Sequence, residues 1–393
     1  MGTSKGITRR QLIKGAAAGV IAAGWSQNIY SAPAKQEIPI AVCTSLSGSS
    51  AYLGQSTVQG AQLAVDQKNA KGGMAGRMFK LVVGDDAANP KEAIPFLRRA
   101  LMRDKAVAVT GNIISDVALA TRGLLEERKI PNIPVMGAVN ELVTEGTRYT
   151  FRITGSAYQW QVAVPQFFKF KELKKVAMLH EDTSYGRDCA KDFVIEAKKQ
   201  GLEIVRVKMT PFGDTNFVPV LNDIKEFAPE GIYVILTGAI NIFATKQMAE
   251  VGLNPKVKLG AYTTSLPFYA EALKDFVIGY YGWSRPTKGA KIQEVEKEYQ
   301  KKYKRGLDIF SCYGYDALNV ITDAVLRANS DDPEAIRDEI SKTRYDGICG
   351  HSVEFTKNGG ALKHQLYIGQ WEKTGSGYEI NEVWHSDVIP PLV

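Results

Sequence analysis

The sequence has few of the residues and motifs from which catalytic and metal centres are built. Its 393 residues include four cysteines and four histidines. The cysteines form no C-x-x-C pair, and the histidines lack the H-x-x-x-H and H-E-x-x-H spacings that bind zinc. A P-loop and a G-x-G-x-x-G after a strand are also missing, and the one G-x-S-x-G string, Gly2–Gly6, follows no strand. We therefore expect a protein that is not an enzyme and needs no cofactor or metal.

The sequence also lacks an apolar run long enough for a membrane anchor. The run Gly15–Trp25 is rich in glycine and alanine and shorter than the roughly 20 apolar residues that cross a bilayer. Arg9-Arg10 precede it and Ala32-Pro33-Ala34 follow it, which together predict an export signal over residues 1–34. The paired arginines resemble the twin-arginine type. We expect cleavage after Ala34 and a location outside the cytoplasm.

The positive charge belongs mostly to that signal. Residues 1–34 carry four basic and no acidic residues, so their removal lowers the net charge from +7 to +3. The most basic stretch that remains, Lys297–Arg305, alternates lysines with glutamates and tyrosines, as a solvated helix face does. We therefore expect no nucleic-acid partner.

Short β-branched runs alternate with segments of helical period from residue 38 onward, which predicts an α/β fold with parallel sheets covered on both faces. The predicted strands are residues 38–44, 79–84, 106–110, 133–136, 176–180, 203–207, 231–236 and 257–259. The predicted helices are residues 58–69, 91–102, 117–128, 161–170, 188–200, 217–227, 242–250, 294–304 and 314–328. A hairpin is expected over residues 352–371, with its turn at Lys357–Gly360.

Roughly 360 residues remain after cleavage, which is more than one core supports and predicts two doubly wound lobes with a break near residues 152–157. Ligands of such sheets bind beyond the carboxyl ends of the strands. The loops at these ends are Leu46–Gly48, Asn112–Ser115, Gly137–Ala138, the HEDTSYG segment from His180, Thr237–Gly238 and Ala261–Thr264. We expect the site there.

The segment HEDTSYGRD, His180–Asp188, could be a catalytic set or a binding loop. Its position at the mouth of a sheet favours a binding loop, and His180 is predicted to end a strand. Asp85 and Asp86 resemble a carboxylate pair, but neighbours on a strand point to opposite faces. An oxidised Cys312–Cys349 pair stays open, since the sequence does not show that the two meet.

Several segments in this order resemble the leucine/isoleucine/valine-binding proteins, type I periplasmic solute-binding components of ABC importers. They are Leu46–Gly76, GDDAANP at Gly84, FRITGS at Phe151, DTSYG at Asp182 and SCYGYDA at Ser311. The resemblance covers about residues 38–371. It implies a monomer whose two lobes, 35–156 plus 286–365 and 157–285 plus 366–393, are joined by three hinge strands and close on one small solute. A membrane permease, or alternatively a sensor, would read the closed form.

The resemblance also implies roles for individual residues. Ser115 takes the place of the hydroxyl that holds a ligand carboxylate at a helix amino end, although it could simply be an N-cap for Val117 or Ala118. Tyr185 matches the tyrosine that covers the solute. Gly137 and Ala138 lie in the loop after the fourth strand.

Three positions depart from the family members that bind amino acids. Ala138 replaces a Thr or Ser, and Ala157 and Tyr262 replace acids that hold the ammonium group. A buried ammonium without a carboxylate is costly. Either the solute lacks a free ammonium, or another acid serves, and the candidates for that acid are Asp116, Glu141 and Asp182.

Aromatic side chains gather in the same loops: Tyr52, Tyr158, Trp160, Tyr185 and Tyr262. They suit a flat or hydrophobic solute, unless some of them only pack the lobes. We expect an aromatic or branched hydrophobic carboxylate, or an amide, ahead of a zwitterionic amino acid.

Overall fold

The computed structural model describes residues 37–391, except 287, 288, 350, 351 and 376. The predicted export signal and its cleavage site at Ala34 lie outside these residues. Among the described helices, none is both long and apolar enough to cross a membrane.

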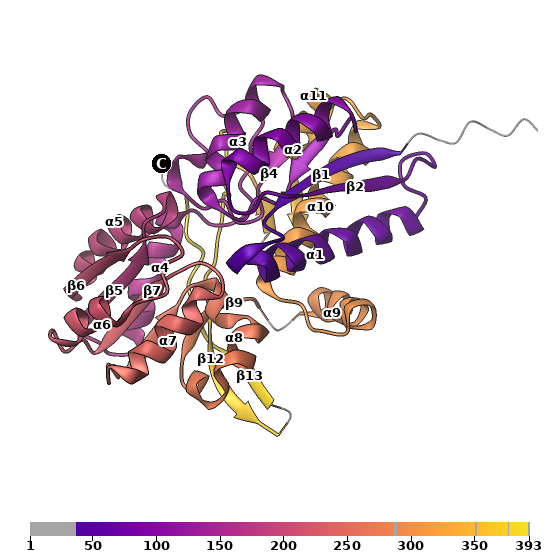
Figure 1. Cartoon of the computed structure of the whole chain (residues 1–393). Coiled ribbons are helices and arrows are strands. Elements are labelled where there is room, and N and C mark those ends of the chain that lie inside the picture. Colours follow the sequence, from indigo (N-terminus) through magenta and orange to yellow (C-terminus); the bar gives the residue numbers. More distant parts are fainter. Residues whose placement is uncertain (1–36, 287–288, 350–351, 376, 392–393) are drawn as a thin grey trace, which may run out of the picture. The chain divides into compact units, whose positions relative to one another are not determined.

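The first sheet has four parallel strands in the order β2-β1-β3-β4 (Figure 1). They are β1 Ile38–Thr44, β2 Phe79–Asp85, β3 Ala108–Thr110 and β4 Asn132–Ile133. Their buried side chains share one core with helices from both halves of the chain. These helices are α1 Ala51–Ala70, α2 Pro90–Met102, α3 Ser115–Glu127, α9 Ala290–Tyr303, α10 Ile309–Ala328 and α11 Pro333–Ser341. A short pair, β10 Arg344–Asp346 and β11 Ser352–Glu354, follows them.

The second sheet has seven strands in the order β13-β12-β9-β8-β7-β5-β6. The strands β5 Lys175–Glu181, β6 Glu203–Thr210, β7 Gly231–Ile235, β8 Val257–Gly260 and β9 Tyr281–Ser284 are parallel. The strands β12 Tyr367–Thr374 and β13 Gly377–His385 add an antiparallel edge. The helices are α4 Ala157–Phe170, α5 Ser184–Lys199, α6 Val218–Lys225, α7 Ile240–Glu250 and α8 Pro267–Leu273. Single-turn helices lie at Gly48–Ser50, Asn140–Leu142, Tyr262–Ser265 and Lys274–Val277.

Alternate residues of β5 show why this sheet carries helices on both faces. Val176 and Met178 belong to one core, which includes residues of α4 and α5. Ala177 and Leu179 belong to another, which includes residues of α6 and α7. Successive side chains of a strand point to opposite faces, so a strand this apolar needs cover on each. The predicted α/β fold with covered parallel sheets is therefore confirmed.

We call the core around the first sheet the first core, and the core that contains Val176 and Met178 the second core. The chain passes between these two cores more than once. Ile153 lies in the first core and Ala157 in the second, and Trp283 lies in the second and Ile292 in the first. Further along, Val353 packs in the first core and Leu366 in the second.

Helices α1 and α10 pack against each other (Figure 1), and glycines lie at their contact. A Cβ atom on Gly60 would lie 1.9 Å from the Ser311 carbonyl oxygen, and one on Gly314 would lie 2.3 Å from that of Thr57. Both distances are far shorter than a van der Waals contact. The two helix backbones therefore touch without side chains between them.

The hairpin predicted over residues 352–371 is confirmed only next to its turn, where Phe355 and Ala361 form an antiparallel bridge and the Leu362 N–H donates to the Glu354 carbonyl at 2.9 Å. Strand β12 pairs with β9 and β13, and β11 pairs with β10. Ile368 and Trp371 of β12 are buried, and Ile368 belongs to the second core, which draws the strand away from residue 352. The predicted turn does form, because the Gly359 N–H donates to the Thr356 carbonyl at 2.9 Å.

Candidate functional site

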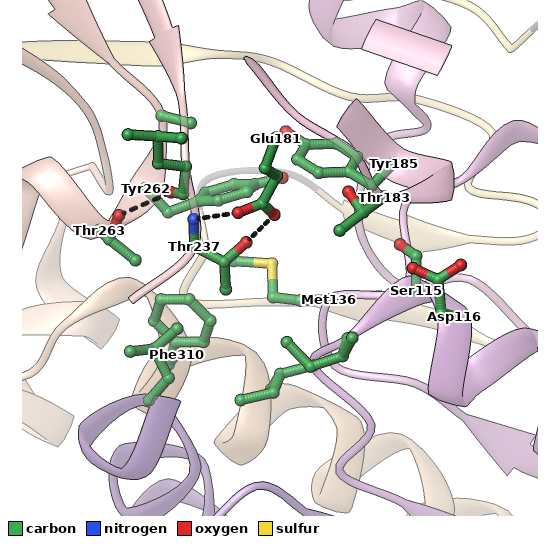
Figure 2. A pocket seen from close by; sticks show the side chains of 15 residues that line it. Ser115, Asp116, Met136, Glu181, Thr183, Tyr185, Thr237, Tyr262, Thr263 and Phe310 are labelled. Atoms are coloured by element: carbon green, nitrogen blue, oxygen red, sulfur yellow. Dashed lines mark hydrogen bonds between the residues drawn. The ribbon is translucent and has the colours of Figure 1, made fainter. Parts of the chain in front are cut away.

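A cavity lies where strand ends and helix beginnings on the sides of the two sheets meet (Figure 2). On the side of the first sheet its walls are Leu53, Ile113, Ile114, Ser115, Asp116, Met136 and Phe310. On the side of the second sheet they are Glu181, Thr183, Tyr185, Leu236, Thr237, Ala261, Tyr262 and Thr263. The space between atoms there is about 510 Å³, including the part open to solvent. Only about 40 Å³ of this space can hold the centre of a water molecule, so the walls lie close together.

The electrostatics of the cavity come from carboxylates and helix ends. Among the described residues its lining contains Asp116 and Glu181 but no lysine, arginine or histidine. Leu53, Ser115, Tyr185 and Phe310 lie in the first turns of α1, α3, α5 and α10. Helix amino ends carry partial positive charge. The partial positive charge of these helix ends offsets the negative charge of Asp116 and Glu181. An anionic group of a solute can therefore bind in the cavity.

Ser115 is the first residue of α3, and Ile114 stands at the N-cap position without a side-chain bond. The Ser115 Oγ instead accepts hydrogen bonds from the backbone N–H groups of Ala138, at 3.2 Å, and Val139, at 3.4 Å. The alternative role of Ser115 as an N-cap is therefore wrong. Its hydroxyl hydrogen has no acceptor among the described residues and can donate into the cavity.

The three candidate acids lie in different surroundings. Asp116 lines the cavity, and its carboxylate accepts hydrogen bonds from the hydroxyl and backbone N–H of Ser184 at the start of α5. Asp182 is exposed and pairs with Arg187. Glu141 is exposed and lies outside the cavity. Only Asp116 is placed to contact a solute there.

Glu181, which the sequence did not single out, is the more deeply buried acid of the cavity. It ends β5, is 1% exposed, and both of its carboxylate oxygens accept hydrogen bonds from Thr237 (Figure 2). The bond from the Thr237 backbone N–H is 2.8 Å long. Burial raises the pKa of Glu181 to about 7, against the lowering effect of the Thr237 bonds.

Tyr185 and Tyr262 form an aromatic wall of the cavity. Their rings are 6.5 Å apart and stacked, and Trp160 packs edge-on behind both, at 5.9 and 4.9 Å. Both phenol oxygens are buried, and within the described residues neither forms a hydrogen bond of regular geometry. Burial raises the pKa of each phenol well above its usual value, so both stay protonated. A solute could therefore accept from either hydroxyl.

Four of the residues predicted for the site lie outside the cavity. Gly137 packs against the Leu142 side chain, and the Ala138 carbonyl accepts from the Ala157 N–H at 2.7 Å. The Tyr158 N–H donates to the Asn140 side chain. The Tyr52 ring packs on Phe268 at 4.9 Å, with Arg305 over its face. Each of them supports the loops or cores instead of lining the site.

The segment HEDTSYGRD divides between the cavity and other contacts. Glu181, Thr183 and Tyr185 line the cavity. The Thr183 hydroxyl caps α5 by accepting from the Gly186 N–H at 3.0 Å. His180 is buried outside the cavity, and burial lowers its pKa. Among the described residues no cluster of His, Cys, Asp and Glu could hold a metal.

Comparisons with known proteins agree with this architecture. A family model described as "Periplasmic binding protein" matches residues 37–376. An amino acid binding protein of Pseudomonas aeruginosa is 26% identical over 356 residues, which cover 88% of this chain and 92% of that protein.

Two solved structures show the same fold. The leucine binding protein LivK of Thermotoga maritima has a TM-score of 0.79 at 23% identity, over 90% of this chain and 99% of that one. A solute binding protein of an ABC transporter from Rhodopseudomonas palustris BisB5, in complex with 3,4-dihydroxy benzoic acid, has a TM-score of 0.81 at 20% identity. That match covers 90% of this chain and 98% of the other.

Proposed function

The chain belongs to the periplasmic binding protein family, and on that premise we propose that it captures one small solute outside the cytoplasm and delivers it to the permease of an ABC importer. The main support for the proposal is the cavity, whose walls come from residues on the sides of both sheets. The export signal over residues 1–34, cleavage after Ala34 and a monomeric state are parts of the same proposal.

The proposed mechanism is closure around the solute. Ser115 is on the first side of the cavity and Tyr185 on the second, so a solute that touches both stabilises the arrangement in which they are close. We place the hinge at residues 153–157, 284–287 and 362–366. They separate a lobe of residues 35–156 plus 286–365 from one of residues 157–285 plus 366–393.

The proposed solute is a hydrophobic or aromatic carboxylate, with an amide as the alternative. The Ser115 hydroxyl at the start of α3 suits a carboxylate oxygen. Leu53, Met136 and Phe310, with the two tyrosine rings, supply apolar contact. The names of the related proteins, which mention leucine and a dihydroxybenzoic acid, are in keeping with this class.

Titration calorimetry on the chain from Lys35 onward tests the proposal with leucine, phenylalanine, benzoate and an aliphatic amide. We expect saturable one-to-one binding of at least one hydrophobic carboxylate, with the compound recovered unchanged. Tight leucine binding without a benzoate response would contradict the preferred class of solute. An absence of binding across the panel would contradict the function.

Closure is tested separately by small-angle scattering with and without a saturating solute. We expect a smaller radius of gyration in the bound protein. Equal radii with a tightly bound solute would rule out the closing step but not the binding.

A further inference from the structure

The lining of the cavity holds a buried acid that the proposed carboxylate solute does not explain. Glu181 is 1% exposed, and no basic side chain lines the cavity with it. Burying a carboxylate without a cation costs several kcal/mol unless hydrogen bonds satisfy its oxygens. An anionic solute would add a second negative charge nearby.

The hydrogen bonds of Glu181 leave acceptor capacity on its carboxylate. The Thr237 hydroxyl donates to Oε1 and the Thr237 backbone N–H to Oε2. A carboxylate has about four lone-pair positions. Even if the Thr183 hydroxyl donates to a third, one position remains on this side chain, which lines the cavity.

We propose that Glu181, oriented by Thr237, accepts a hydrogen bond from the bound solute. The inference rests on the proposed function. The solute is then a carboxylate that also carries an O–H or N–H donor, which is the chemistry of a hydroxylated aromatic acid or an amino acid.

Other polar groups of the cavity are less suited to this selection. Asp116 accepts from Ser184 through both oxygens, as Glu181 does from Thr237, but it is only partly buried, so water can replace a missing solute donor there. The phenols of Tyr185 and Tyr262 can donate as well as accept, so they tolerate solutes with or without a donor. Above its pKa of about 7, Glu181 is ionised and only accepts, so it discriminates there against a solute that lacks the donor, and the probes are compared at about pH 8.5.

A purely structural role for Glu181 makes a different prediction. The bonds to Thr237 also fasten the end of β5 to the loop after β7. If that were all, replacing Glu181 would weaken every solute by the same factor. The two readings are separated by pairs of probes that differ only in the donor.

Two such pairs are 3,4-dihydroxybenzoate with benzoate, and leucine with 4-methylpentanoate. Their affinities are measured by calorimetry for the wild type, Glu181→Gln and Asp182→Asn. The last is a matched control, because Asp182 is the next residue in the chain but is exposed and outside the cavity. Cooperative thermal unfolding establishes that each variant is folded.

We expect the wild type to bind the donor-bearing member of one pair at least about tenfold more tightly. Glu181→Gln removes that preference, and Asp182→Asn keeps it. The pair that shows the preference tells a hydroxyl donor from an ammonium donor.

Equal binding of both members of each pair by the wild type would overturn the inference, whether or not the variant folds. An equal loss for both members in Glu181→Gln would overturn it too, since only the structural role would remain. If the wild type binds none of the four probes, the proposed function fails first.

Discussion

The strongest quantitative prediction concerns Glu181 in the protein without solute. Its pKa is raised by burial from an ordinary 4.5 to about 7. Between these pH values the unfolded chain has lost the proton while the folded protein retains it. The free energy of unfolding therefore falls as pH rises through this window and is constant again above it. A glutamine at position 181 has no proton to lose, so Glu181→Gln removes this contribution.

The magnitude follows from the pKa values. One pKa unit corresponds to about 1.4 kcal/mol. The rise from 4.5 to about 7 makes the ionised carboxylate about 3 kcal/mol more costly in the folded protein than in the unfolded chain. Between pH 5 and pH 8, the stability of the wild type should therefore fall relative to that of Glu181→Gln by about 2 to 3 kcal/mol.

Urea denaturation of both proteins at pH 5, 6, 7 and 8 measures this difference. The fluorescence of Trp160 and Trp283, which are buried in one of the two cores packed against β5, reports unfolding there. His180 is present in both proteins, so its own titration largely cancels. A stability difference that does not change with pH would refute the reasoning, whatever its absolute value.

Two further predictions concern the first side of the cavity. Ser115→Ala removes the hydroxyl that we assign to the carboxylate and should weaken a bound carboxylate about 10- to 150-fold by calorimetry, since a hydrogen bond to a charged group contributes about 1.5 to 3 kcal/mol. An amide solute should lose less, and unchanged carboxylate affinity would contradict the assignment. Gly60→Ala places a Cβ 1.9 Å from the Ser311 carbonyl oxygen and should destabilise the protein by about 1 to 3 kcal/mol or more in urea unfolding. Gly123→Ala is the control, because no atom lies within 4 Å of its added Cβ; equal stability of the two variants would contradict the close contact.

The order of strands and helices could be predicted because the apolar pattern changes period at most boundaries. The beginning of α1 could not: it starts at Ala51, before the predicted residue 58. Gly54, Ser56 and Thr57 have no apolar signal, yet all are buried there by tertiary contact. The antiparallel edge was missed for a related reason. No residue of the strand β13 is fully buried, so its apolar pattern is weak and its pairing with β12 defines it.

The candidate site was predicted in position but only in part by residue. The strand-end rule pointed to the loops of Ser115, Asp116, Tyr185 and Tyr262, which do line the cavity. Glu181 was missed because sequence does not reveal that a strand-end acid turns inward to bond Thr237. The sequence did contain one indication of Glu181, which is the first acid after the predicted apolar strand of residues 176–180.

The contact between α1 and α10 limits which wall of the cavity can adapt to its contents. Leu53 and Phe310 stand in the first turns of these helices, and the glycine contacts at Gly60 and Gly314 join the two backbones. Neither helix can slide or tilt without forcing carbonyl groups into its neighbour. The space beside Leu53 and Phe310 therefore has a fixed size, which limits the volume of the apolar part of the solute. Evolution toward bulkier solutes would have to alter the loops that follow β5, β7 and β8.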